Sequence, residues 1–154
     1  MPKTRWLTEE EQRTWRAFLG ASQLLLDRLE HDLQREAGLP HTYYEILVHL
    51  SEAPNRMLRM SELADRSLAS RSRLSHAVDR LGQLGWIERI QCPEDKRGAY
   101  ARLTDTGFGA IEKAAPGHVA SVRAHLFDQL SPQQVKQLRD ISEAVLKTLV
   151  SAES

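Results

Sequence analysis

Hydrophobic residues near the start of the chain recur every three or four positions, which is the spacing of one face of an α-helix. Thr8 and Glu11 stand just ahead of this stripe and three residues apart, the arrangement of a capping box at a helix N-terminus. Gly38 and Pro40 interrupt the pattern, because neither residue favours the continuation of a helix. We therefore expect a long first helix over residues 8–36.

A second stripe near the other end of the chain consists of Val135, Leu138, Ile141, Ser142, Val145 and Leu149. Ser131 and Gln134 form a capping box ahead of it, and Pro132 occupies the first helical position. The pattern predicts a final helix over residues 131–150.

A shorter apolar stripe follows Pro40. Thr42 and Glu45 are spaced as a capping box, so we expect a helix that opens at Thr42 and is stopped by Pro54. The residues that follow, 57–59, favour a short strand.

Two serines then precede short helical patterns. Ser61 is expected to cap a helix of about seven residues whose apolar face includes Leu68, and after a brief turn Ser70 is expected to cap another that ends near Leu84. A helical step of 100° places four apolar residues on one face of the second helix: Leu74, Ala77, Val78 and Leu81. Two short helices joined in this way indicate a helix-turn-helix.

Two β-favouring runs, 86–90 and 99–103, flank the polar segment 93–98, and they predict a hairpin. Thr104 is expected to cap a helix that Pro116 must kink or break. The expected fold class is α+β, mostly helical with a small β-hairpin wing: a winged helix-turn-helix between terminal helices.

Composition narrows the class of protein. The chain has 154 residues, 27% of them charged, and no apolar run long enough to span a membrane, so a globular cytoplasmic protein without membrane contact is expected. No phosphate-binding glycine loop, nucleophile motif or carboxylate cluster points to an enzyme. The six histidines and one cysteine lack metal-ligand spacing, so neither metal nor cofactor is expected.

The formal net charge of zero hides an uneven distribution. Residues 56–102 hold ten Arg or Lys against six Asp or Glu, a net charge of +4. This excess suits a surface that faces a polyanion, although an uneven solvated surface is an alternative.

On the helix after Ser70, the face opposite the apolar stripe carries short polar side chains and arginines. The predicted DNA-binding residues of this helix are Ser70, Arg71, Ser72, Arg73, Ser75, His76 and Arg80. Ser and His can approach base edges in the major groove, Arg can pair with guanine, and the free N–H groups of the helix N-terminus can meet phosphates. The alternative is an ordinary solvated face.

The hairpin tip adds Lys96 and Arg97, which we expect to reach the adjacent minor groove. An acid beside phosphate would repel it, so Asp95 is expected to pair with Arg97 or another arginine and hold the tip in shape. Gly98 is expected to allow the tight return of the chain.

Three segments together resemble the MarR family of bacterial transcription regulators. They are the wing and the strand after it (95–107), Met60-Ser61-Glu62-Leu63-Ala64, and Leu74-Ser75-His76-Ala77-Val78-Asp79-Arg80-Leu81. The resemblance extends over nearly the whole chain. It implies a regulator, by analogy a repressor, that binds a pseudo-palindromic operator in double-stranded DNA.

The resemblance also implies a homodimer, with residues 1–38 and 105–154 forming a helical dimerisation region and 39–104 the DNA-binding lobe. The terminal apolar stripes agree with burial against a partner, and packing within one chain is the alternative. A winged helix that binds only proteins remains a rival, but it would not need a basic hairpin tip.

Family members often bind aromatic or phenolic acids, which implies a small aromatic carboxylate or phenolic effector here. The residues expected to line its pocket are Trp15, Arg16, Leu19, His41, Tyr43 and Tyr44. For Trp15 and Leu19, a purely structural role in the core is the competing interpretation. Cys92 lies in the wing strand and is interpreted as an ordinary residue rather than a redox sensor.

Overall fold

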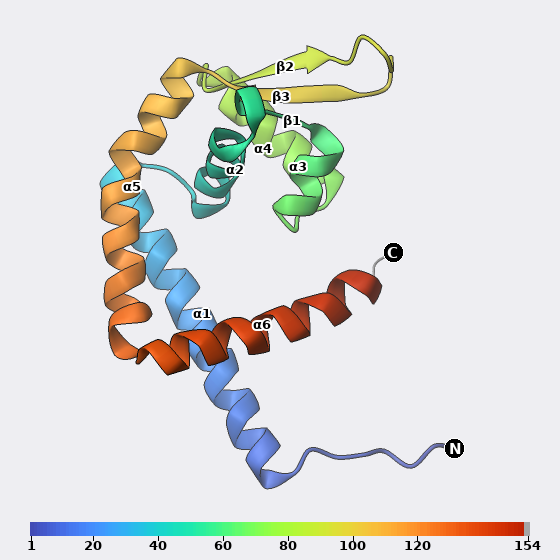
Figure 1. Ribbon diagram of the computed structural model, residues 1–154, viewed down its shortest axis with the longest axis vertical. Helices are drawn as coiled ribbons and strands as arrows, with labels where there is room; N and C mark the ends of the chain where they lie inside the picture. The colour runs from blue at the N-terminus through green and yellow to red at the C-terminus, as the bar shows by residue number, and fades with distance from the viewer. Residues whose placement is uncertain (153–154) are drawn as a thin grey trace. The chain divides into compact units, whose positions relative to one another are not determined.

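A computed structural model describes residues 1–152 (Figure 1). In chain order its elements are α1 (Glu9–Ala37), α2 (His41–Glu52), η1 (Pro54–Arg56), β1 (Met57–Arg59), α3 (Met60–Arg66), α4 (Arg71–Gln83), β2 (Ile87–Gln91), β3 (Ala99–Leu103), α5 (Asp105–His125), η2 (Phe127–Gln129) and α6 (Pro132–Ala152). The fold is mostly helical with one small antiparallel sheet, as predicted. Within this part of the chain, no helix is both long and apolar enough to cross a bilayer.

The chain divides into two compact units. The first combines residues 1–28 with those from 119 onward, and the second comprises residues 29–118. The boundaries expected from sequence, at 38 and 105, lie at helix ends, whereas those of the compact units lie inside α1 and α5.

The sheet of the second unit has the strand order β1-β3-β2, with both pairings antiparallel. Ala101 on β3 is opposite Leu58 on one side and Arg89 on the other, so these three side chains share a face. Leu58 and Ala101 are buried, and so are Ile87 and Leu103 of the same face. The predicted strand at 57–59 and the predicted hairpin are both confirmed.

One core fills the second unit, and α2, α3, α4 and the inner face of the sheet all contribute to it. Its fully buried large side chains are Ile46, Leu47, Leu50, Leu63, Leu74, Val78 and Leu81. The predicted stripe of α4 therefore faces the core.

The cap of α4 forms as expected, because Ser70 Oγ accepts a hydrogen bond from the backbone N–H of Arg73 at 3.2 Å. The two preceding caps were predicted wrongly. Thr42 lies inside α2, which begins at His41, where the carboxylate of Glu30 accepts the backbone N–H at 2.9 Å. A carboxylate eleven residues away in the sequence takes the place of the expected local cap.

Ser61 likewise lies inside α3, which begins one residue earlier at Met60. Leu68 is not part of an apolar face: it is 70% exposed and lies in the turn with φ of +51°. The helix ends before Leu68 because the left-handed backbone turns the chain toward α4.

Thr104 caps α5 as predicted, since its Oγ1 accepts the backbone N–H of Gly107 at 3.1 Å. Of the two outcomes expected at Pro116, a kink or a break, the break does not occur, because α5 runs from Asp105 to His125 with Pro116 inside it. Pro116 removes one backbone donor and leaves the rest of the hydrogen-bonded ladder able to continue.

Both capping boxes of the first unit form. Thr8 and Glu11 exchange hydrogen bonds of 2.7 and 3.1 Å, and Ser131 and Gln134 exchange hydrogen bonds of 2.9 and 3.2 Å. The helices are therefore well defined at their N-termini. Yet none of the described side chains of this unit, in 1–28 and 119–151, is buried.

Candidate nucleic-acid interface

The outward face of α4 presents the side chains that the sequence predicts. Ser72, Arg73, His76 and Arg80 are exposed, on the side opposite the buried stripe of the helix. Ser75 is half-buried and already bonded, because its Oγ accepts a hydrogen bond from Arg89 at 2.9 Å. The hydroxyl of Ser70 is engaged in the helix cap.

The wing tip is shaped by Asp95 through the backbone. Asp95 Oδ1 accepts the backbone N–H of Arg97 at 2.9 Å, and the carbonyl of Asp95 accepts the N–H of Gly98 at 3.0 Å. The expected pairing of Asp95 with an arginine side chain is thus replaced by a bond to the main chain. The turn is thus held by hydrogen bonds within it, and the side chains of Lys96 and Arg97 on this turn are both exposed.

Gly98 is needed for space rather than for an unusual backbone angle. A Cβ at this position would lie 3.1 Å from Cys92 Sγ and 3.2 Å from Asp95 Oδ2. Cys92 is only 3% exposed, so its sulfur packs beneath the tip. The small residue lets the tip close over the base of the wing.

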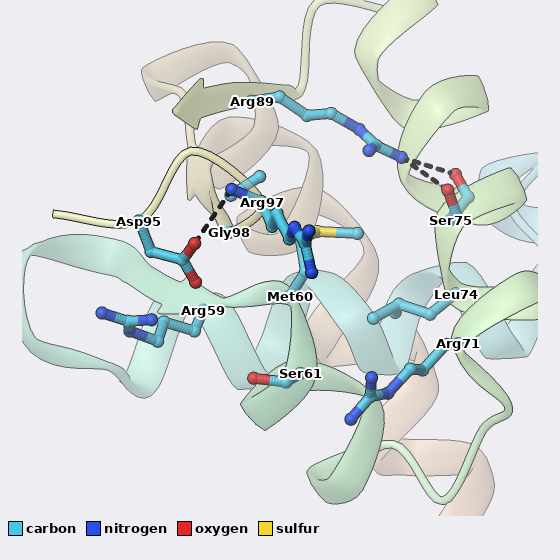
Figure 2. A pocket seen from close by; sticks show the side chains of 11 residues that line it. Arg59, Met60, Ser61, Arg71, Leu74, Ser75, Arg89, Asp95, Arg97 and Gly98 are labelled. Atoms are coloured by element: carbon cyan, nitrogen blue, oxygen red, sulfur yellow. Dashed lines mark hydrogen bonds between the residues drawn. The ribbon is translucent and has the colours of Figure 1, made fainter. Parts of the chain in front are cut away.

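An open groove of about 480 Å³ lies between the wing, the start of α3 and the start of α4. Four arginines line it: Arg59, Arg71, Arg89 and Arg97 (Figure 2). Its remaining lining residues are Met60, Ser61, Leu74, Ser75, Asp95, Gly98 and Ala99. Because guanidinium groups pair in a bidentate manner with phosphate oxygens, a groove with this lining suits a nucleic-acid backbone.

Arg71 and Arg97 of this groove were expected from sequence, whereas Arg59 and Arg89 were recognised only as part of the basic segment. Arg59 ends β1 opposite Tyr100 of β3, and its guanidinium lies 5.4 Å from the Tyr100 ring. Hydrogen bonding to the Tyr100 side chain raises the pKa of Arg59 above its ordinary value. The strand register that creates this contact was not visible in the sequence.

The residues expected to bind an effector fall into two groups. His41, Tyr43 and Tyr44 belong to the second unit, where the ring of Tyr44 lies 4.6 Å from that of His118 and is 6% exposed. Burial raises the pKa of Tyr44. Tyr43 packs partly buried against the core, and His41 lies 5.4 Å from His118.

Trp15, Arg16 and Leu19 belong to the first unit and are exposed, with Trp15 at 51%. A second hollow of about 520 Å³ lies in the second unit. Its lining residues are Glu36, Ala37, Leu39, Trp86, Thr106, Gly109, Ala110 and Lys113. None of the six predicted effector residues lines this hollow, so the effector pocket stays a prediction.

No group of three or more His, Cys, Asp or Glu side chains in residues 1–152 is arranged to hold a metal ion.

Comparison with known proteins bears directly on this interface. A family model described as the MarR family matches residues 37–98. Among solved structures, a MarR family transcriptional regulator from Streptomyces coelicolor, Sco3205 in complex with DNA, is 52% identical, with a TM-score of 0.93 over 95% of this chain and 92% of that one. AbsC, another MarR family regulator from Streptomyces coelicolor, is 42% identical, with a TM-score of 0.92 over 96% and 99%.

A curated relative, the HTH-type transcriptional repressor YetL of Bacillus subtilis, is 27% identical over 93% of both chains. The 52% identity along nearly the full length, the matching fold and the basic groove beside α4 agree with one another. The chain belongs to the MarR family and is a winged helix-turn-helix, DNA-binding transcriptional regulator, not an enzyme.

Proposed function

We propose that the protein is a repressor that binds a pseudo-palindromic operator as a homodimer, and that a small aromatic or phenolic acid weakens this binding. The observation that carries the proposal is the arginine-lined groove, which lies between the start of α4 and the wing tip. In this arrangement α4 enters a major groove while Lys96 and Arg97 reach the neighbouring minor groove. The repressing sense of the regulation is supported by the relative YetL.

The division of labour follows from side-chain chemistry. Arg73 and His76, exposed in the first two turns of α4, are the proposed base-reading residues, with Ser72 beside them. Arg71 and Arg97 line the arginine-lined groove of the protein, and they are the proposed contacts with DNA phosphates. Ser70 contributes as the helix cap, and Arg80 extends the positive surface toward the end of the helix.

The homodimer is supported by the first unit, which has helices but no buried side chain among its described residues. Such a unit gains stability by covering its apolar stripes with a second copy. We accordingly propose residues 1–38 and 105–154 as the dimerisation region and 39–104 as the DNA-binding lobe.

The effector is supported by the fold alone. NadR, a structure of this fold at 19% identity and a TM-score of 0.69, was solved in complex with 4-hydroxyphenylacetate. For this chain we propose the same chemical class of ligand, bound by aromatic and basic groups among Trp15, Arg16, Leu19, His41, Tyr43 and Tyr44.

The test selects bound duplexes from a random pool, with and without added aromatic acids, and then measures affinity for the selected site over a series of salt concentrations. A palindromic site, and an affinity that falls steeply with salt, are expected. Arg97→Ala should lower the salt slope by about one unit. Arg73→Ala should cost about 1–3 kcal/mol and relax the preference at one base-pair position.

Each part of this test has an outcome that would contradict the corresponding part of the proposal. If no duplex is enriched and binding is absent even at low salt, the chain is a protein-binding winged helix instead. If Arg73→Ala weakens all sequences equally, Arg73 contacts phosphate rather than a base. If none of the acids changes either selection or affinity, the effector proposal fails while the DNA-binding proposal stands.

A further inference from the structure

Arg89 is a charged residue on the apolar face of the wing sheet. It pairs with Ala101 in the β2–β3 register, so its side chain emerges on the face where Ile87, Leu58 and Ala101 are buried. This face packs on α4. An arginine here therefore points toward the recognition helix and not away from it.

The guanidinium of Arg89 makes three contacts, all with α4. Nη2 donates to Ser75 Oγ at 2.9 Å and to the Ser75 carbonyl at 3.1 Å, as Figure 2 shows, and lies 2.9 Å from Asp79 Oδ1. Ser75 and Asp79 are one helical turn apart on α4, so one guanidinium nitrogen connects two successive turns of the helix. β2 leads directly into the wing tip, and the link therefore joins the reading helix to the wing.

Asp79 places a negative charge beside the Arg89 guanidinium, and the same nitrogen donates to both Ser75 oxygens. This guanidinium is therefore less available to phosphate than those of Arg71 and Arg97, for which no acidic partner is found in residues 1–152. All three contacts are made by one nitrogen, Nη2, so Arg differs from Lys here because the Lys ammonium lies on a shorter side chain.

We propose that Arg89 and Asp79 form a positioning pair, which fixes the wing relative to α4 and does not itself contact DNA. The proposal rests on the proposed interface, in which α4 and the wing tip occupy neighbouring grooves. If the pair is lost, the two reading elements no longer hold the spacing that both grooves require, and affinity falls even though no phosphate contact is removed.

Asp79→Asn gives the sharpest test, because the two explanations predict opposite signs. Removing a negative charge from a surface that faces DNA should strengthen binding if Asp79 acts only through its charge. If Asp79 positions Arg89, the same substitution should weaken binding, by about tenfold. Arg89→Ala should weaken binding to a similar extent and leave the salt slope unchanged, whereas Arg97→Ala lowers that slope.

The double variant Arg89→Ala with Asp79→Asn should bind no more weakly than either single variant, because one link is lost in every case. Arg89→Lys should bind more tightly than Arg89→Ala but more weakly than the unmodified protein. The matched control is Arg102→Ala: Arg102 pairs with Glu88 across the same two strands, at 2.5 Å, but on the opposite face of the sheet. It should change affinity less than twofold.

Thermal unfolding of each variant shows that the measured affinities refer to folded protein. Tighter binding by Asp79→Asn, additive losses in the double variant, or a salt slope lowered by Arg89→Ala would each overturn the positioning role. Failure of the unmodified protein to bind any duplex would instead reject the proposed function, so the two failures are distinguishable.

Discussion

Single residues in this protein are constrained most tightly where α5 leaves the sheet. Gly107 lies in the first turn of α5, and a Cβ there would collide with the carbonyl oxygen of Trp86 and lie 2.7 Å from Leu103 Cδ1. Thr104 approaches the same place, because its backbone N–H donates to the Trp86 carbonyl at 3.0 Å and its hydroxyl donates to Gly85 at 2.6 Å. Backbone atoms therefore hold the end of the wing sheet against the helix, with no room for a side chain.

Gly107→Ala should destabilise the protein by about 1–3 kcal/mol, because the backbone of Trp86 must move to admit a methyl group. The matched control is Gly109→Ala, two residues later on the same helix, where a Cβ would meet nothing within 4 Å. That substitution should stabilise by about 0.5–1 kcal/mol, since alanine favours a helix more than glycine does. Urea unfolding of both variants checks the prediction, and equal effects would contradict it.

At the scale of elements, aromatic rings join α5 to α2. His118 of α5 packs against Tyr44 and lies 5.4 Å from His41, which is itself 3.7 Å from a carboxylate oxygen of Glu45. Burial lowers the pKa of His118, the positive charge of His41 lowers it further, and Glu45 opposes both effects. The neutral form of His118 is therefore the one that the packed helices favour.

A lowered pKa means that the unfolded chain binds protons more readily than the folded chain. Stability associated with His118 is accordingly complete above its ordinary pKa of 6.5 and is lost as the pH falls below that value. His118→Gln should reduce the drop in melting temperature between neutral and mildly acidic pH. His31→Gln, at an exposed position of α1, should leave the drop unchanged. An unchanged pH dependence in His118→Gln would contradict the assignment.

At the scale of the whole molecule, the first unit leaves large apolar side chains in contact with solvent. On α6, Ile141 is 63% exposed, Val145 50% and Leu149 58%, and on α1 Phe18 is 55% exposed. Helices with such stripes are marginal without a surface to cover them. A second copy of the chain is the cover that the proposed function requires.

Val145→Glu should therefore shift the protein toward monomer and weaken operator binding, because a carboxylate in an apolar interface is costly to bury. The control, Lys147→Glu, places a carboxylate on the polar side of α6 and should leave the assembly intact. Sedimentation of both variants across a range of concentrations measures the change, with circular dichroism to show that the helices persist. A dimer that tolerates Val145→Glu would place the interface elsewhere.

Local rules were sufficient for several features that depend on residues close in sequence, although not for the caps expected at Thr42 and Ser61. The capping boxes at Thr8 and Ser131, the cap at Ser70 and the buried stripe of α4 all formed as the sequence predicts. Each of these features involves a hydrogen bond or a periodicity within a few residues, and the chain specifies it without reference to the rest of the fold.

Only the tertiary structure decided the features that join distant segments. The carboxylate of Glu30 starts α2 in place of the expected Thr42 cap, β1 pairs with β3 so that Arg59 meets Tyr100, and Arg89 reaches α4 across the inner face of the sheet. These contacts depend on strand register and helix packing, which follow from the shape of the whole core. The sequence alone determined the helix-turn-helix and its basic wing, and the packing of the second unit determined how the two are held together.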